Sequence, residues 1–187
     1  MAMPAASARA SKYSTPGIPL SELVIKTFYK GLKTLDHLLT VAEAHAKESN
    51  VDANAMYPDA RLADDMLPFT FQVQNATTTV RKTMSRIGMM RTQIWPDTER
   101  TMGELHDRIE KAFDLLDRAE PKLIDQRLND LVELPFGRDT FKVTVKDSVI
   151  DHGIPNFFFH IQTAYAILRS KGVPLGKRDY LTLFLAL

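Results

Sequence analysis

Apolar residues recur every three or four positions through much of the chain, which is the spacing of one face of an α-helix. The stripe that starts at Val24 and ends at Ala46 is the longest example. Comparable stripes recur three more times, separated by segments rich in proline and turn-forming residues. The pattern predicts four long amphipathic helices, over residues 21–48, 68–87, 101–120 and 147–171.

Several residues at the predicted helix ends have the types that start or stop helices. Ser21 is the expected N-cap of the first helix, and Thr101 with Glu104 matches the capping-box pattern at the third. In the fourth helix we expect Pro155 to cause a kink near the start and Gly172 to end it.

Three segments outside the long helices favour other structure. Residues 140–145 alternate apolar and polar side chains, which predicts a short strand with residues 132–136 as its candidate partner. Residues 123–134 suit a short helix or a loop, and residues 176–180 suit a segment that docks the C-terminus onto the helices. We therefore expect an all-α fold, a four-helix bundle with a short extended or β-like segment before the last long helix.

The chain has 187 residues, a length that suits one ordinary domain. Residues 1–18 are rich in Ala, Ser and Pro and contain no acid, which is typical of a flexible tail and, alternatively, of a transit peptide. We expect residues 19–187 to form a single helical domain. Because no apolar run approaches the ~20 residues that cross a bilayer, we expect no membrane partner and a cytoplasmic location.

Composition narrows the chemistry. The sequence contains no cysteine, which excludes disulfides and thiolate metal sites, and its formal charge of +1 argues against a nucleic-acid partner. Charge is nevertheless uneven, because residues 66–96 contain four Arg or Lys and no acid, whereas residues 97–133 have an excess of acids. These stretches could pair helices or subunits, or each could be a solvated surface.

None of the five histidines lies three or four residues from another, which is the spacing of helical metal sites. Instead, polar residues form a row along the last predicted helix. Asn156 and His160 are one turn apart, His152 lies a turn earlier, and Tyr165 extends the row. The row could be satisfied within the core, or it could line a pocket for a small molecule, with His160 as the acid or base.

A second polar group surrounds the start of the second predicted helix. Arg61 and Asp65 precede that helix, and Gln72 lies just off its apolar stripe. Asp65 could cap the helix, or it could join Gln72 and His160 as a carboxylate-oriented imidazole. Trp95, the only tryptophan, could flank the mouth of the same pocket or mark the end of a core.

The strings PNFFFH at 155–160 and LGKRDY at 175–180 resemble a bacterial and fungal family of unknown function that is grouped with the DinB/YfiT-like proteins. The resemblance covers residues 19–181. It implies a DinB-like four-helix bundle that is usually dimeric, so we expect a second copy of the chain as a partner. The candidate pocket at the polar row adds a small molecule as the other expected partner.

Members of this superfamily often hold a divalent metal with three histidines, one from the second helix and two on the last. Aligned in this way, His160 occupies one of the paired positions and Asn156 the other, while the second helix has no histidine. Because two of three ligands are missing, we predict neither a metal nor another cofactor.

Three functions remain open. The chain could bind a small molecule in a central, metal-free pocket, with acid–base chemistry such as isomerisation or cyclisation. It could be a divalent-metal-dependent thiol S-transferase, as the superfamily implies. It could also be a non-catalytic dimeric interaction module.

Overall fold

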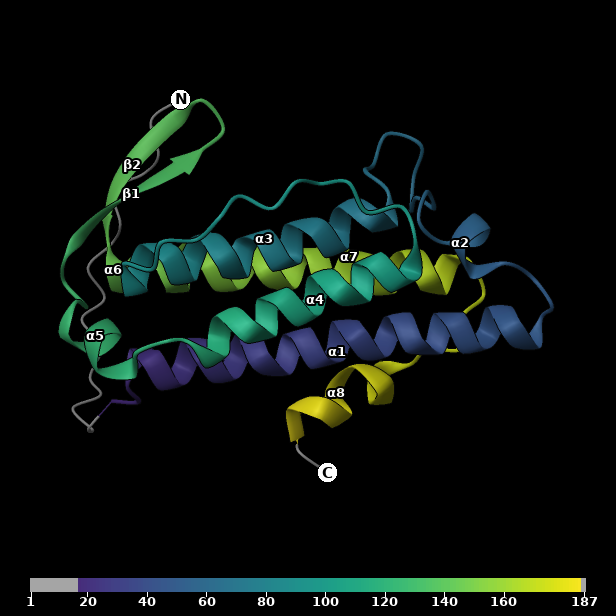
Figure 1. Ribbon diagram of the computed structural model, residues 1–187, viewed down its shortest axis with the longest axis horizontal. Coiled ribbons are helices and arrows are strands. Elements are labelled where there is room, and N and C mark those ends of the chain that lie inside the picture. Colours follow the sequence, from purple (N-terminus) through teal and green to yellow (C-terminus); the bar gives the residue numbers. More distant parts are fainter. Residues whose placement is uncertain (1–16, 186–187) are drawn as a thin grey trace.

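The structure is a computed structural model that describes residues 17–185. Most of the expected 1–18 tail therefore lies outside the described residues. The four predicted long helices are present as α1 (Leu20–Glu48), α3 (Phe69–Gly88), α4 (Met102–Asp117) and α7 (Ile154–Ser170) (Figure 1). The shorter elements are α2 (Ala53–Met56), α5 (Pro121–Gln126), β1 (Leu131–Phe136), β2 (Asp139–Thr144), α6 (Val145–Asp147), a π-helical turn η1 (Ser148–Gly153) and α8 (Lys177–Leu185).

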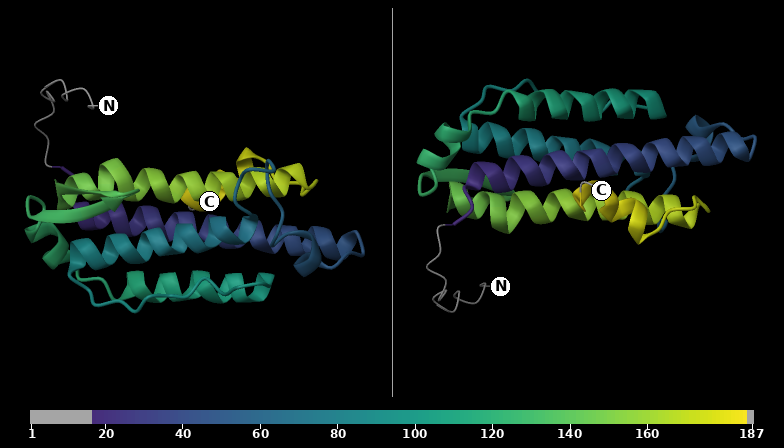
Figure 2. Two further views of the ribbon diagram at one scale, coloured as in Figure 1. Left: turned by 90° about the horizontal axis from the view of Figure 1, so that it is seen from above. Right: turned by 90° about the horizontal axis from the view of Figure 1, so that it is seen from below.

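The four long helices lie side by side, and α1 and α3 each pack against both α4 and α7 (Figure 2). Their apolar stripes meet in one core; Val24, Phe28, Val80 and Ile109 are all completely buried. At Gly31 of α1 a Cβ atom would lie 2.3 Å from the Phe157 ring, so the missing side chain permits this close packing of α1 on α7. The predicted all-α fold is confirmed.

The long connection between α3 and α4, residues 89–101, runs back along α3 (Figure 1). As a result α4 runs parallel to α3, whereas a short connection would have made the two helices antiparallel. The connection contains no helix or strand. We call residues 89–101 the strap.

Helix ends agree with the sequence at α4 and differ at α1. Thr101 and Glu104 form the predicted capping box, with both reciprocal hydrogen bonds present. Ser21, however, is not the N-cap of α1. The helix begins at Leu20, and its N-cap is Pro19. The Ser21 backbone N–H and hydroxyl instead both donate to the Asp125 carboxylate of α5, at 2.9 and 2.7 Å. A side chain from another element therefore satisfies a backbone donor at the start of α1.

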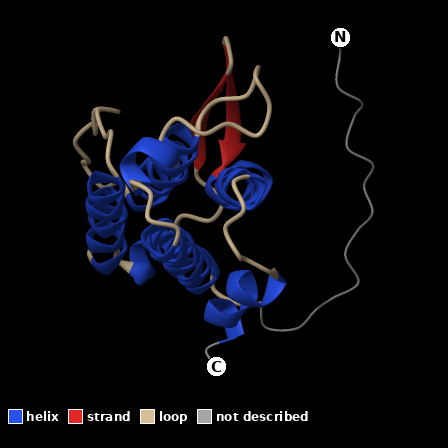
Figure 3. Ribbon diagram, turned by 90° about the vertical axis from the view of Figure 1, so that its right-hand side faces the viewer, coloured by secondary structure: helices blue, strands red, loops and turns tan. Residues whose placement is uncertain are grey.

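The predicted strand and its candidate partner form an antiparallel hairpin of β1 and β2, with Phe136 opposite Asp139 at the turn. Gly137 in that turn has a φ of 62°, the left-handed region that suits glycine. The hairpin stands at one end of the helices, close to where α3 ends and α7 begins (Figures 1 and 3).

The last predicted long helix is divided into α6, η1 and α7. A π-helical turn, rather than a kink at Pro155, interrupts it, and Pro155 sits in the first turn of α7, where its missing N–H does no harm. Gly153 at the end of η1 comes close to α3, since a Cβ atom there would lie 3.0 Å from the Thr83 hydroxyl.

Two short segments differ in part from expectation. The 123–134 segment contains the end of α5, which already begins at Pro121, and the start of β1. The C-terminal segment docks onto the helices as predicted, but it does so as a helix, α8, on α1. Lys30 and Thr34 of α1 donate to the Phe184 and Tyr180 carbonyls at 2.6 and 3.3 Å. Within residues 17–185, no helix has the length and apolar character needed to span a bilayer.

Candidate functional site

The polar row of α7 faces α3, and two side chains of the row make hydrogen bonds across this interface. The Asn156 side-chain amide donates to the Thr79 hydroxyl at 2.7 Å. One turn further along, His160 Nδ1 lies 2.9 Å from Gln72 Oε1, so the predicted approach of Gln72 to His160 is confirmed.

His160 is held in one orientation and in its neutral form. The Gln72 side-chain N–H donates to the Leu67 carbonyl at 3.0 Å, which leaves its oxygen to accept the proton of His160 Nδ1. The rings of Phe71 and Phe159 approach the imidazole edge-on. Burial lowers the pKa of His160 to about 4, so the imidazole is uncharged at neutral pH.

The other predicted site residues do not gather around His160. Asp65 is exposed and makes no hydrogen bond to Gln72 or His160 among the described residues, so the expected Asp65–Gln72–His160 arrangement is not formed. Arg61 donates to the Met66 carbonyl within its own loop. Tyr165 packs on Tyr180 of α8, with its hydroxyl 3.5 Å from the Leu175 carbonyl.

Trp95 also lies apart from the polar row, in the strap. The guanidinium groups of Arg81 and Arg108 lie 6.0 and 5.9 Å from the centre of its ring, which is the range of cation–π contacts. Trp95 thus contacts two arginines and is not part of the mouth of a pocket at His160.

A cleft of about 590 Å³ opens beside His152 and Asn156, at the start of the polar row. One face of α3, the first part of η1–α7 and the hairpin form its walls. Asn156 lines this cleft, but His160 does not. The lining residues are Asn75, Thr78, Thr79, Arg81, Lys82, Thr83, Ser85, Arg86, Glu133, Pro135, Phe136, Gly137, His152 and Asn156. We call this the α3–hairpin cleft.

Three of the four cations of the acid-free stretch line this cleft. Arg81, Lys82 and Arg86 all line it, against a single carboxylate, that of Glu133. Arg86 is oriented by the hairpin, because its Nε donates to the Glu133 backbone carbonyl at 3.0 Å. NH1 of Arg81 donates to the Thr92 hydroxyl of the strap at 3.3 Å.

Three buried side-chain nitrogens around the cleft have no hydrogen-bond partner among the described residues. They are Nε of Arg81, NH1 of Arg86 and Nδ1 of His152. Buried polar atoms in proteins are nearly always paired, with protein groups or with ordered water, so these three nitrogens have the capacity to bind water or a ligand.

The titratable groups in the cleft respond to burial and to each other. Burial, and then the charges of Arg86 and Lys82, lower the pKa of His152. Burial lowers the pKa of Arg86, and burial followed by the Arg108 charge lowers that of Arg81, which Asp97 partly offsets. Burial is thus the main cause of all three shifts, and neighbouring cations add to it at His152 and Arg81.

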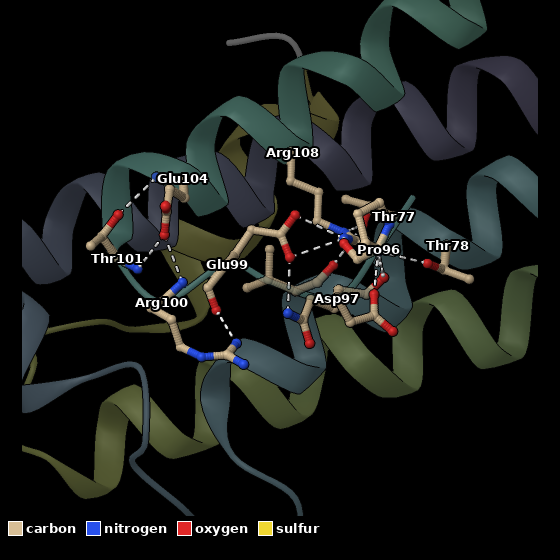
Figure 4. A network of polar contacts seen from close by, with 11 residues as sticks. Thr77, Thr78, Pro96, Asp97, Glu99, Arg100, Thr101, Glu104 and Arg108 are labelled. Carbon is tan, nitrogen blue, oxygen red and sulfur yellow. Dashed lines mark hydrogen bonds and ion pairs between the residues drawn. The ribbon is translucent and has the colours of Figure 1, made fainter. Parts of the chain in front are cut away.

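A second arginine site next to the cleft is fully paired (Figure 4). Arg108 of α4 is completely buried and its guanidinium reaches the strap and α3. It forms ion pairs with Asp97 at 2.7 Å and Glu99 at 2.9 Å. Its remaining hydrogen bonds go to the side chains of Thr77 and Thr78 and to the carbonyls of Pro96 and Gln74. Arg108 therefore fastens the strap to α3 and α4.

The residues at the superfamily's metal positions do not fit a metal. Asn156 provides an amide in place of an imidazole, and that amide donates to the Thr79 hydroxyl. Within residues 17–185, no three His, Cys, Asp or Glu side chains come close enough together to hold an ion. The donor set needed for a three-ligand site is thus missing from this part of the chain.

Sequence reasoning missed most of the cleft. It singled out Asn156 and placed His152 in the same row, and it noted the acid-free stretch that contains Arg81, Lys82 and Arg86. That stretch was the signal, because an acid-free run of cations on a helix is unusual next to an acidic segment. Glu133 and Phe136 gave no signal, since they reach the cleft only through the fold of the hairpin.

Comparison with known proteins supports the relationship of this chain to the DinB-like proteins. The model of a domain of unknown function, DUF1993, matches residues 20–181. A crystal structure of a DinB family member from Shewanella denitrificans is similar to this chain with a TM-score of 0.80 and 33% sequence identity, over 87% of this chain and 91% of that one. No curated protein matches the chain. The chain belongs to the DUF1993 family and has a DinB-like fold.

Proposed function

We propose that this DinB-like protein binds a small molecule, without a metal, in the α3–hairpin cleft. The observation that carries the proposal is the cleft itself. Its volume of about 590 Å³ falls within the roughly 300–1,000 Å³ of small-molecule sites. Its walls come from separate elements, and helical bundles often build their binding sites in this way.

Two residues of the polar row take part in this proposal. Asn156 lines the cleft while its amide is fixed on Thr79, so its side-chain oxygen is left to accept a hydrogen bond. His152 is the imidazole in the lining, and its Nδ1 is unpartnered within the described part of the chain. In any acid–base reaction in the cleft, His152 is the group positioned for proton transfer.

We assign His160 a different part, that of holding α7 on α3. It is 7% exposed, it bonds to a side chain that is itself bonded to the chain, and its lowered pKa makes it a weak base. These features suit a histidine that is satisfied inside the fold. Its acid–base role stays a prediction, which His160→Gln would test through activity on any ligand found.

A blocking variant tests the proposal. Asn75 lines the cleft and its side chain makes no hydrogen bond to another described residue, so Asn75→Trp should fill part of the cleft without breaking a contact. Gln93→Trp, at an exposed strap position that does not line the cleft, is the matched control. The measurement is the rise in Tm with a panel of neutral, cationic and anionic metabolites.

We expect at least one compound to raise the Tm of the wild type and of Gln93→Trp in a saturable manner, but not that of Asn75→Trp. If no compound does so, or if Asn75→Trp responds as the wild type does, the proposal fails. The expected homodimer and the cytoplasmic location stay predictions. Light scattering on the purified chain would test the first, and fractionation of cells the second.

A further inference from the structure

We propose that the ligand of the α3–hairpin cleft is a small organic anion, whose carboxylate or phosphate group binds between Arg81 and Arg86. This inference rests on the proposed function and narrows it to one class of ligand. It is argued from the donors, the charges and the shape of the cleft.

The unpartnered donors carry the first step. Arg86 is held by the hydrogen bond from its Nε to the hairpin, and this leaves NH1 buried without a partner in the described residues. Nε of Arg81 is in the same state. A buried donor without an acceptor destabilises the fold, and more so when the group is charged. A ligand with several acceptor oxygens would satisfy both guanidinium groups, which bind carboxylate and phosphate particularly well.

The lining of the cleft contains more positive than negative charge. Three cations line the cleft, and the one acid in the lining, Glu133, lies directly opposite Lys142 across the hairpin. The cleft therefore lacks negative charge, and a monoanion or dianion would correct this. His152 Nδ1 can donate to the same anion when the ring carries a proton there.

A second cavity of similar volume has a lining of the opposite charge. It has about 550 Å³, lies between α1 and α4, and is lined by Asp36, Glu110, Asp114 and Asp117 with Lys33 as its cation. An anion entering that cavity would meet four carboxylates. The charge of the α3–hairpin cleft therefore favours an anion, whereas that of the cavity between α1 and α4 disfavours one.

The size and lining of the cleft indicate the character of the ligand beyond its anionic group. The cleft is much larger than a phosphate or carboxylate group, and the hairpin contributes Pro135 and Phe136 to it. The threonines of α3 and Asn156 line the side formed by the helices. We infer a ligand with one anionic group at the arginines and an uncharged or apolar part beside Phe136.

Calorimetric titration tests this proposal with two probes, inorganic phosphate and acetate, at constant ionic strength in sodium chloride. The variants are Arg86→Gln and Lys82→Gln. The matched control is Arg91→Gln, an exposed cation from the same acid-free stretch that does not line the cleft. Circular dichroism confirms that each variant is folded.

We expect saturable binding of at least one probe to the wild type. Arg86→Gln should weaken it by about tenfold or more, and Lys82→Gln, an exposed cation, by about threefold, while Arg91→Gln leaves it unchanged. The probe that binds more tightly identifies the anionic group as phosphate or carboxylate. Acetate alone binding would assign a carboxylate ligand.

Two results would overturn the inference. One is that neither probe binds in competition with chloride; the other is that Arg91→Gln weakens binding as much as Arg86→Gln does. If neutral metabolites still protect the wild type and not Asn75→Trp, the cleft binds small molecules but the anionic class is wrong. If the panel also gives no protection, the proposed function fails together with the inference.

Discussion

Two arginine sites flank Trp95, and they differ in one respect. Arg108 is completely buried, and every nitrogen of its guanidinium has a partner in α3 or the strap. Arg81 and Arg86 are only partly buried, yet each leaves one buried nitrogen without a partner among the described residues. The more deeply buried charge is thus the better satisfied one.

This difference separates a structural role from a binding role. A charge that is buried with all its partners is part of the fold, because removing it leaves those partners unpaired. A partly buried charge with an open donor has the capacity to bind a further group. The same distinction separates His160, whose Nδ1 is paired with Gln72, from His152, whose Nδ1 has no partner among the described residues.

Replacing Arg108 should destabilise the protein most. Arg108→Met leaves the buried Glu99 carboxylate without its ion pair, and breaking a buried pair in this way costs about 3–5 kcal/mol. Urea unfolding at pH 7 measures the loss. Adding Glu99→Gln to Arg108→Met should recover part of it, because the uncompensated charge is gone. A loss below about 1 kcal/mol in the single variant would show that this network does not hold the strap.

His160 should weaken the fold in acid. Its pKa of about 4 in the folded protein lies below the ordinary 6.5, so the unfolded chain binds the proton first. The contribution of neutral His160 to the free energy of unfolding is therefore full above about pH 6.5. This free energy decreases by about 2 kcal/mol as the pH falls toward 4. His160→Gln, which keeps a donor for Gln72, should remove this part of the acid sensitivity in urea unfolding at pH 7 and 4.5. An unchanged difference between the two pH values would contradict the assignment of His160 to the core.

Arg86→Gln should affect stability little. Because its NH1 has no partner to lose among the described residues, we expect a change within about 1 kcal/mol of the wild type, in either direction. Binding of the probe anion, phosphate or acetate, should nevertheless weaken by about tenfold or more. If Arg86→Gln destabilised the protein as much as Arg108→Met, the proposed contrast between the two arginine sites would be wrong.

His106 should produce the smallest effect, with the opposite sign to His160. Its ring bridges Asp36 and Glu43 of α1 at 2.5 and 3.1 Å. The hydrogen bond with Asp36 raises the pKa of His106; burial opposes this, and Glu43 adds to it. The contribution is full below about pH 6.5 and is lost as pH rises through the raised pKa. Because the pair is partly solvated, we expect about 0.5 kcal/mol, measured as the difference between wild type and His106→Gln at pH 6 and 9.

Helices with a long apolar stripe could be predicted from the sequence, because periodic burial dominates their energy. The N-cap of α1 could not, since Pro19 is at that position and the Ser21 N–H is satisfied by Asp125 from α5. The π-helical turn was also missed. It lies where Gly153 packs closely on Thr83, and such a tertiary contact leaves no periodic signal.

The candidate site was predictable only in part, for a related reason. Residues on one helix can be placed relative to each other by spacing, so Asn156 and His160 were correctly assigned to one face of α7. Joining them to the arginines of α3 depends on how the hairpin folds over the end of the bundle. The alternative that joined Asp65 to Gln72 and His160 was wrong, because Asp65 is exposed in the loop before α3 and its place relative to α7 depends on the path of that loop.

The most direct test of the contrast between the two arginine sites is a titration of the protein with inorganic phosphate, followed through the Nε–H signals of its arginines by nuclear magnetic resonance. Arg81→Lys, Arg86→Lys and Arg108→Lys assign the signals. We predict that the signals of Arg81 and Arg86 shift in a saturable manner, while that of Arg108 does not move. Shifts of equal size at all three arginines, or no shift at Arg81 and Arg86 either in this titration or in the same titration with acetate, would contradict the account.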